Sequence, residues 1–353
     1  HTLPVHARQH FPQRLLGEAQ DDPRTAGTTV FENKGIRLWT LDKPGAEGVL
    51  LASFKTKMNV MGPDVLEGLQ RAVAMAEAAY EGLVIWQTDA PFSAGADLQA
   101  MLPGFMVGGV AMVEQAEQAM QDTFARIRYA QVPVVAAIRG MALGGGCEVS
   151  VHCARRVAAM ESYIGLVEVG VGLVPGAGGL AYIARRAAEN MALSTGTDML
   201  PFLAEPFKAA AMATVGTSAL ESRRLGYLLD SDVIVPHTDE VLGVALAQVK
   251  AMAASGHRPP LKRTFAAAGR SVKATLVGSL INMRDGGFIT AHDFHIAERI
   301  AHVVCGGDVE AGTPIDEDYL YALERQAFCS LIAHPKTQER ILGLLNTGKP
   351  LRN

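Results

Sequence analysis

Two carboxylates stand alone in long apolar stretches of this sequence. Glu148 is the only formally charged residue between positions 140 and 154, and Glu168 is the only one between positions 162 and 184. A buried carboxylate without a partner costs several kcal/mol or takes up a proton, so each needs a partner or a chemical task. Because a raised pKa suits a carboxyl group to acid and base catalysis, Glu148 and Glu168 are the first candidates for catalytic residues.

Glycine-rich sequence surrounds both glutamates. Gly144, Gly145 and Gly146 come just before Glu148, and residues 165–179 around Glu168 are also rich in glycine. Glycine lets the backbone approach a ligand closely. The segment after the triple glycine is predicted to form a short helix, whose first amide groups lack partners within the helix. The sequence therefore predicts a site for an anion or a developing oxyanion at this point.

Alternating strand and helix patterns indicate what positions these residues. Three strands open the chain, and the third is apolar at nearly every position, so we expect it inside a sheet. Apolar residues three and four apart predict one helix from Pro63 and a second over 110–127, each followed by a buried strand. The strands are expected at 29–33, 36–42, 48–54, 83–87, 134–138 and 155–160. This alternation predicts right-handed crossovers and an α/β fold.

From about Leu203 onward the pattern is helical. Residues 1–28 are polar and without a sustained period, as expected for a linker or the tail of a missing upstream domain. We therefore predict a tail at 1–28, an α/β core at 29–202 and a helical C-terminal region at 203–353. Within that region one strand is expected at 233–235, and helices are expected at 209–215, 218–229, 239–254, 273–284, 291–304, 317–333 and 337–345.

Composition limits the possible functions. The 353 residues are 49% hydrophobic, enough for a large core. Scattered Lys and Arg at a net charge of -4 argue against nucleic-acid binding, and no apolar run reaches the roughly 18 residues of a membrane span. The four cysteines lack CxxC spacing, which favours free thiols in the cytoplasm. His152, His237, His292 and His295 lack metal-binding spacing, so we expect them to be structural and predict no metal site.

Three motifs then show a resemblance. Phe92-Ser-Ala-Gly-Ala-Asp-Leu98, Ala142-Leu-Gly-Gly-Gly-Cys-Glu148 and the stretch 165–179 resemble the three signatures of the crotonase (enoyl-CoA hydratase/isomerase) family, in the same order. The match covers about 29–186. The long helical C-terminal part and the linker-like start resemble the bacterial multifunctional β-oxidation proteins, in which a 3-hydroxyacyl-CoA dehydrogenase precedes the hydratase.

The resemblance implies a fold and a reaction. The fold would be a right-handed spiral of ββα turns with two roughly perpendicular sheets. The reaction would be hydration of a trans-2-enoyl-CoA in fatty acid β-oxidation, with enoyl-CoA isomerase or acyl-CoA hydrolase activity as alternatives. Carried over by position, the amides of Ala96 and Gly145 would hold the thioester oxygen, Glu148 would activate water and Glu168 would protonate carbon. Contacts to the substrate and its coenzyme A would come from Lys55, Lys57, Ala94, Asp97, Leu98 and Gly144.

The resemblance also implies partners. No cofactor is expected on this chain, because coenzyme A enters with the substrate and NAD would bind only the missing upstream domain. We expect a homo-oligomer, such as a trimer, together with that dehydrogenase domain and a thiolase. The segment 185–204 is longer than in single-function hydratases and could shape the acyl pocket, contact the dehydrogenase or form a surface insertion. The methionine-rich segment 101–120 could be a mobile wall of an acyl tunnel.

Two readings from other classes compete with this one. Residues 176–181 fit the dinucleotide-binding pattern G-x-G-x-x-A, but Pro175 precedes them and no strand ending in an acidic residue follows at the required distance. A non-catalytic module that binds CoA thioesters would keep the glycines and lose the two acids. Asp97 fits a helix N-cap better than a catalyst.

Overall fold

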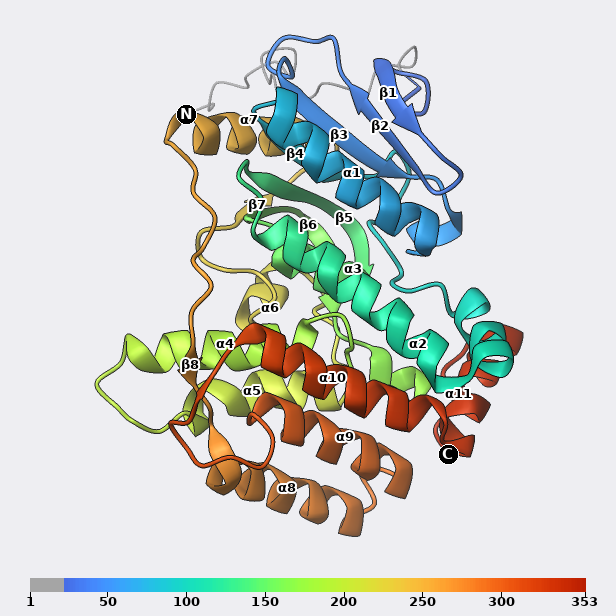
Figure 1. Cartoon of the computed structure of the whole chain (residues 1–353), viewed down its shortest axis with the longest axis vertical. Coiled ribbons are helices and arrows are strands. Elements are labelled where there is room, and N and C mark those ends of the chain that lie inside the picture. The colour runs from blue at the N-terminus through green and yellow to red at the C-terminus, as the bar shows by residue number, and fades with distance from the viewer. Residues whose placement is uncertain (1–21) are drawn as a thin grey trace, which may run out of the picture.

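A seven-stranded sheet organises the computed structural model, which describes residues 22–353 (Figure 1). Its strands, which lie side by side in sequence order, are β1 (Thr28–Glu32), β2 (Ile36–Thr40), β3 (Val49–Phe54), β4 (Gly82–Trp86), β5 (Val134–Leu143), β6 (Arg155–Gly165) and β7 (Val233–Val235). The first three strands pair antiparallel, and every later neighbouring pair is parallel. The predicted interior position of 48–54 is confirmed, because β3 is buried throughout between β2 and β4.

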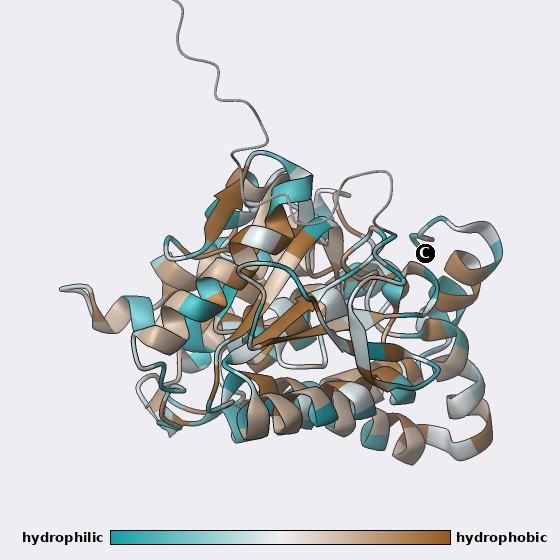
Figure 2. Cartoon of the chain, turned by 90° about the horizontal axis from the view of Figure 1, so that it is seen from above, coloured by the Kyte–Doolittle hydropathy of each residue, from teal (hydrophilic) through white to brown (hydrophobic). Residues whose placement is uncertain are grey.

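Both faces of the sheet are buried at its inner strands, which explains why β3 and β4 are apolar at nearly every position. In β4, Leu83 and Ile85 pack into a large core on one face, whereas Val84 and Trp86 pack into a smaller core on the other. Successive side chains of a strand point to opposite faces, so a strand covered on both sides has to be apolar at every position. In Figure 2 the hydrophobic colouring gathers on the strands in the middle of the molecule.

Helices connect the parallel strands across the larger core. These are α1 (Pro63–Ala79), α2 (Leu98–Arg128) and α3 (Gly145–His152). On the other face, α7 (Val241–Ala254) covers the smaller core and contacts β3 to β6. Because β3 to β7 are parallel, the loops that leave β4 and β5 emerge at the same edge of the sheet, where ligands of α/β proteins usually bind.

The C-terminal helices pack on the large core and stack below the sheet in Figure 1. They are α4 (Gly179–Ala192), α5 (Leu200–Ala211), α6 (Ala219–Arg224), α8 (Gly269–Asp285), α9 (Ala291–Val304), α10 (Glu317–Ile332) and α11 (Pro335–Thr347). One cluster of buried hydrophobic residues runs from Ile36 to Ile341, and β7 belongs to the main sheet. The predicted region 203–353 thus shares a core with the α/β part, and the division at 203 stays a prediction.

Most of the predicted helices and strands are present, and the differences between prediction and structure have local causes. The helix expected at 209–215 is wrong: α5 ends at Ala211, and Ala213 turns with a φ of 53°. Two-residue strands, β8 (Phe265–Ala266) and β9 (Pro314–Ile315), were not predicted because they are too short to show a pattern.

The ends of the predicted core also need correction. Of the tail predicted at 1–28, residues up to 21 lie outside the described part, and Thr28 already belongs to β1. Beside the main sheet, the described chain forms isolated β-bridges at Met61–Ala96, Ser93–Ala142 and Ile164–Gly216, and the second, perpendicular sheet implied by the resemblance stays a prediction. The pairing of β5 with β6 shifts its register between Ile138 and Gly140.

A buried ion pair ties the starts of β6 and β7 together. Asp232 accepts hydrogen bonds from the backbone amide of Arg156 at 2.9 Å and from its Nε at 2.7 Å, and Nη2 of Arg156 lies 2.6 Å from the same carboxylate. The amide of Leu229 donates to Asp232 at 2.6 Å. Both charged side chains are buried, so removing one would leave an uncompensated charge in the interior.

We expect Asp232→Ala to lower the free energy of unfolding by about 3–5 kcal/mol, because the buried guanidinium of Arg156 loses its counter-charge. Urea titration followed by circular dichroism measures this loss. Asp230→Ala is the matched control: Asp230 is exposed, and its removal should cost less than about 0.5 kcal/mol. Equal losses in the two variants would contradict the assigned role of the pair.

Candidate active site

The loop that follows β4 runs beside the end of β5. The amides of Phe92 and Ser93 donate to the carbonyls of Arg139 and Met141, each at 3.0 Å. The amide of Leu143 donates back to the carbonyl of Ser93 at 3.0 Å. These bonds bring the next residues of the loop against the triple glycine at the start of α3.

Two backbone amides, those of Ala96 and Gly145, lie next to each other here. The Met61 amide donates to the Gly95 carbonyl and the Met61 carbonyl accepts from the Asp97 amide, which leaves the Ala96 amide between them without a backbone acceptor in the described chain. Gly145 is the first residue of α3, so its amide has no acceptor within the helix. A methyl group on Gly145 would lie 3.4 Å from the Ala96 nitrogen.

Two neighbouring glycines make this approach possible. Gly95 has a φ of 103° and Gly144 a φ of 54°, both in the left-handed region that side chains disfavour. A Cβ atom on Gly95 would lie 2.9 Å from the Leu143 carbonyl oxygen, closer than side chains normally come. The glycine spacing therefore fixes how closely the two loops pack.

Glu148 reaches from the first turn of α3 to the start of α4. Its Oε1 accepts hydrogen bonds from the amides of Ala177 and Gly179, each at 2.9 Å. The residue is only 2% exposed. Two N–H donors and the positive end of the α4 dipole stabilise its ionised form.

Glu168 begins a 3-10 turn, η3 (Glu168–Val171), which follows β6 and ends at Gly172. A Cβ atom on Gly144 would lie 3.1 Å from Oε1 of Glu168, so this carboxyl group lies over the triple glycine. Its Oε2 is buried and has no hydrogen-bond partner among the residues that the structure describes. Buried polar atoms are rarely left without a partner, so this oxygen points to a ligand.

Both carboxyl groups and both amides line one cavity of about 110 Å³. The structure therefore brings together Glu148, Glu168, Ala96 and Gly145, which the sequence analysis had named as one set. The cavity lies where the loops after β4 and β5 meet the turn before α4. A carbonyl oxygen bound by the two amides would be held beside two acids.

Burial dominates the electrostatics of the acid pair. Burial raises the pKa of Glu148 to about 7, although hydrogen bonds from the amides of Gly179 and Ala177 oppose the rise. Burial, followed by repulsion from Glu148, holds the pKa of Glu168 well above its ordinary value. At neutral pH the pair therefore favours a proton on Glu168 and a partly ionised Glu148.

A third carboxyl group in the cavity, that of Glu117 on α2, was missed by the sequence analysis. Glu117 is 2% exposed, and burial followed by the charge of Glu148 raises its pKa to about 8. A Cβ atom on Gly176 would lie 2.5 Å from Oε2 of Glu117, which places this carboxyl group against the turn before α4. Glu114 lies close by on the same helix, so nothing in the local sequence marks Glu117 as buried.

A fourth carboxyl group, that of Glu324 on α10, holds the same turn from another side. Glu324 accepts from the Gly178 amide at 2.8 Å and the Ala181 amide at 2.7 Å. The Nε2 of Gln121 donates to Glu324 at 3.2 Å and to the Gly176 carbonyl at 2.7 Å. Sequence reasoning had no signal for these contacts, because they join segments far apart in the chain.

A larger cavity of about 450 Å³ adjoins the first and lies along α1 and α2. Ala96, Met101, Glu117 and Met120 line both cavities. The methionine-rich segment 101–120 thus forms a wall of the larger cavity, as expected for an acyl tunnel, and its mobility stays a prediction. In the described chain, no residue of 185–204 lines either cavity, which argues against the pocket-shaping role considered for that segment.

The other residues predicted to contact the substrate fall in two places. Ala94, Leu98 and Gly144 line the small cavity. Asp97 lines the large one, and its carboxylate caps α2 by accepting from the amides of the second and third residues of that helix. The N-cap role expected for Asp97 is therefore confirmed, and a contact with coenzyme A stays a prediction.

Lys55 and Lys57 lie on the exposed segment after β3. The Nζ of Lys55 lies 2.6 Å from a Glu32 carboxylate oxygen and donates to the Asn33 carbonyl at 2.9 Å. Lys57 is exposed in the short turn η2 (Lys57–Asn59). Neither lysine lines the two cavities, so the structure does not bring them to the acid pair. Their contact with a nucleotide stays a prediction.

The dinucleotide-binding pattern at 176–181 lacks its structural context. Residues 173–178 form no strand, and α4 leads to α5 rather than to a strand. His152 is buried, its Nδ1 lies 2.7 Å from the Glu148 carbonyl oxygen, and burial lowers its pKa to about 4, as expected for a structural histidine.

Among residues 22–353, no group of three His, Cys, Asp or Glu side chains is placed to hold a metal ion. No helix in that range has the length and hydrophobicity to span a membrane. The four cysteines are free and buried, as predicted.

Curated relatives are similar to this chain in sequence, mostly over part of their own length. The chain is 36% identical over 324 residues to the Bacillus subtilis protein named "Probable 3-hydroxyacyl-CoA dehydrogenase", a match that covers 92% of this chain and 40% of that protein. It is 30% identical over 179 residues to the short-chain-enoyl-CoA hydratase of Clostridium acetobutylicum, covering 50% of this chain and 65% of the relative. The chain thus spans less than half of the first relative.

Solved structures agree on the fold. The enoyl-CoA hydratase of Bacillus halodurans superposes with a TM-score of 0.57 at 15% identity, covering 87% of this chain and 99% of that one. An enoyl-CoA hydratase from Mycobacterium avium subsp. paratuberculosis superposes with a TM-score of 0.54 at 16% identity. This match covers 90% of this chain and 98% of that one. Residues 45–217, which hold both glutamates and both amides, match the family model of enoyl-CoA hydratase/isomerase. This segment, just under half of the chain, belongs to the enoyl-CoA hydratase/isomerase family, also called the crotonase family.

Proposed function

We propose that the chain hydrates trans-2-enoyl-CoA to 3-hydroxyacyl-CoA in fatty acid oxidation. The observation that carries this proposal is the single cavity in which two free amides, those of Ala96 and Gly145, face two buried acids, Glu148 and Glu168. The family match and the enoyl-CoA hydratase among the relatives support the choice of substrate.

The amides act on the thioester carbonyl. As water adds, negative charge moves to the thioester oxygen, and two N–H donors already aimed at that point stabilise it. Removal of one such donor typically costs about 2.7–4 kcal/mol of transition-state stabilisation. The start of α3 directs its positive end toward the same oxygen.

The two acids move protons. Glu148 takes a proton from water while the water oxygen bonds to C3, and the double-bond electrons shift toward the thioester as an enolate. The enolate collapses as C2 takes the proton of Glu168. Glu148 has then gained one proton and Glu168 has lost one, and transfer between the two coupled carboxyl groups restores the starting state.

The hydratase is proposed to be one part of a larger protein with further partners. The relatives named as a dehydrogenase and as a trifunctional fatty acid oxidation enzyme support a dehydrogenase fused to the hydratase in the whole protein. NAD would bind that part, and the hydratase would need coenzyme A only as part of its substrate. A homo-oligomer such as a trimer, a thiolase partner and a cytoplasmic location belong to this proposal.

The acyl chain of the substrate would extend from the acid pair along α2 into the larger cavity. That cavity adjoins the small one at Glu117, and its walls are mainly apolar. Its volume of about 450 Å³ suits a chain longer than four carbons. A neutral Glu117 is compatible with the passage of an apolar chain, because an ionised one would have to lose its remaining hydration.

Glu148→Gln and Glu168→Gln should each lower kcat for crotonyl-CoA hydration by about 100-fold or more, since each removes one proton-transfer group. Loss of absorbance of the conjugated thioester measures the rate. Glu161→Gln is the control, because Glu161 is exposed on β6 and lies between Glu148 and Glu168 in the sequence. This variant should hydrate crotonyl-CoA at the unmodified rate. Hydration at the unmodified rate by both site variants would refute the mechanism.

The pH profile of kcat/KM should be bell-shaped. Glu148 acts as a base, so activity should fall as the pH drops through its raised pKa of about 7. Glu168 acts as an acid, so activity should also fall at high pH, where its strongly raised pKa is finally exceeded. Rates measured from about pH 5 to about pH 10 test this, and a flat profile over that range would be inconsistent with the assigned acid and base.

A large side chain placed in the larger cavity should lower activity toward long-chain substrates more than toward short-chain ones. Ala116 lines that cavity at an exposed position of α2, so Ala116→Trp should lower kcat/KM for a 16-carbon enoyl-CoA about tenfold more than for crotonyl-CoA. Gln115→Trp, on the same helix but outside the cavity lining, is the control. Equal effects on both substrates, or a strong preference of the unmodified chain for four carbons, would contradict an acyl tunnel here.

A further inference from the structure

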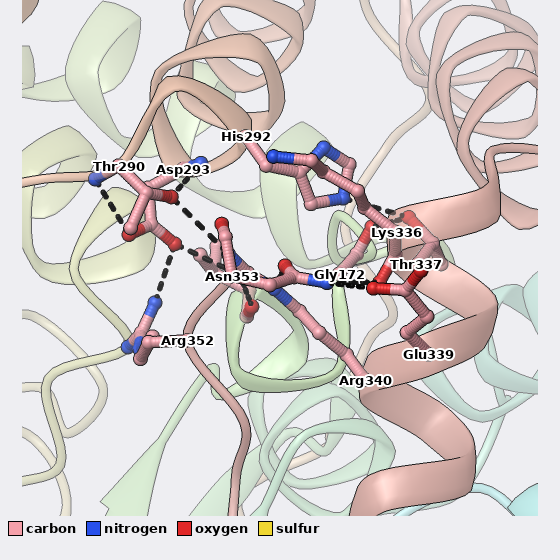
Figure 3. Close-up of polar contacts among 11 residues, drawn as sticks. Gly172, Thr290, His292, Asp293, Lys336, Thr337, Glu339, Arg340, Arg352 and Asn353 are labelled. Atoms are coloured by element: carbon pink, nitrogen blue, oxygen red, sulfur yellow. Dashed lines mark hydrogen bonds and ion pairs between the residues drawn. The ribbon is translucent and has the colours of Figure 1, made fainter.

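A helix far along the chain contacts the turn that carries Glu168. Two buried residues of α11, Thr337 and Arg340, donate hydrogen bonds to the backbone of the turn η3 (Figure 3). They stand three positions apart and therefore lie on the same side of the helix. Both are fully buried, which is rare for an arginine.

Thr337 and Arg340 bind two carbonyl groups of that turn. Nη1 of Arg340 donates to the carbonyl of Val169, the residue after Glu168, at 2.9 Å. The hydroxyl of Thr337 donates to the carbonyl of Gly172, which ends the turn, at 2.8 Å. The Val169 carbonyl also accepts from the Gly172 amide at 3.0 Å, so Arg340 adds a charged donor to a carbonyl that already closes the turn.

Glycine at position 172 makes the approach of α11 possible. Gly172 has a φ of 84°, in the left-handed region, and a Cβ atom there would lie 2.8 Å from the Cα of Thr337. The backbone of the turn thus rests directly on the backbone of α11. A loosened α11 contact would let η3, and with it Glu168, change position.

Arg340 is itself held by the side chains of Asp293, Asn353 and Thr290. Its Nη1 lies 2.8 Å from the carboxylate of Asp293 in α9, and its Nε donates to the side chain of Asn353 at 2.8 Å. Asp293 is shared with a second arginine, because Nη1 of Arg352 lies 2.8 Å from the same oxygen. Figure 3 shows Arg340 and Arg352 converging on Asp293. In the described structure Arg352 makes no hydrogen bond to η3 and does not line the cavity.

We propose that Arg340 and Thr337 are positioning residues that fix Glu168 over the triple glycine for proton transfer to the substrate. This inference rests on the hydratase function proposed above. Glu168 has no hydrogen-bond partner on its Oε2, so its place in the cavity depends on the backbone of η3. A shift of about 1 Å in a catalytic group can cost on the order of 100-fold in rate.

Arg340→Met and Thr337→Val test the inference with crotonyl-CoA. We expect kcat to fall about 10-fold to 100-fold with KM changed less than about twofold, because the turn moves while the cavity remains. Asp293 keeps Arg352 as a partner when Arg340 is replaced, so no buried charge is left unpaired. Thr337→Ser restores the hydroxyl group and should return kcat to near the unmodified value.

Arg352→Met is the matched control. It removes the other arginine of Asp293 without touching the turn, so it should lower stability while kcat stays unchanged. A second readout is the alkaline limb of the pH profile. Water that reaches Glu168 in a loosened turn lowers its raised pKa, so this limb should move to lower pH in Thr337→Val and Arg340→Met but not in Arg352→Met.

The outcomes separate two failures. Folded Thr337→Val and Arg340→Met with unmodified kcat, or an equal loss of kcat in Arg352→Met, would overturn the positioning role. If Arg340→Met does not fold, the comparison of Thr337→Val with Thr337→Ser decides alone. A Glu168→Gln variant that hydrates normally would instead refute the proposed function on which the inference rests.

Discussion

Four buried carboxyl groups, three around one glycine-rich turn and one at the triple glycine, are the constraint on which this structure depends. Glu148, Glu117 and Glu324 contact residues 176–181, and Glu168 lines the same cavity as Glu148 and Glu117. Like charges repel strongly at low dielectric, so the four cannot all be ionised together. Backbone amides satisfy two of them, and protonation accommodates the others.

Protonation has a consequence for stability. Burial raises the pKa of Glu117 from an ordinary 4.5 to about 8 and that of Glu148 to about 7. A carboxyl group with a raised pKa in the folded state binds its proton more tightly there than in the unfolded chain. Its contribution to the free energy of unfolding is therefore complete below about pH 4.5 and is lost as the pH rises toward 7 and 8. The fold gives up stability at neutral pH to keep proton-transfer groups available.

The sequence carried strong local signals for part of this arrangement. Glu148 and Glu168 could be found because no charged residue lies near them in the chain. Gly95 beside Ala96, and Gly144 and Gly146 beside Gly145, mark where two backbone segments approach each other. Strands β3 to β6 were found because burial on both faces makes every position apolar.

Contacts between distant segments left no such signal. Glu117 belongs to a helix with other acidic residues, and only packing against Gly176 makes it part of the cavity. Glu324 and Arg340 look like ordinary charged residues of amphipathic helices, yet both are fully buried at the back of the site. Each binds backbone groups of a glycine-rich turn in addition to side chains, and a backbone group has no residue type that a sequence pattern could reveal.

The position of Glu117 links the two cavities chemically as well as spatially. An acyl chain in the larger cavity would displace water beside this carboxyl group, and further desolvation raises its pKa, which keeps it neutral. The charge of an ionised Glu117 helps to raise the pKa of Glu168. Glu117 ionises only above its raised pKa of about 8, so in that alkaline range a bound chain that keeps it neutral weakens one of the forces that hold the proton on Glu168. Occupation of the larger cavity would there ease the release of that proton toward C2.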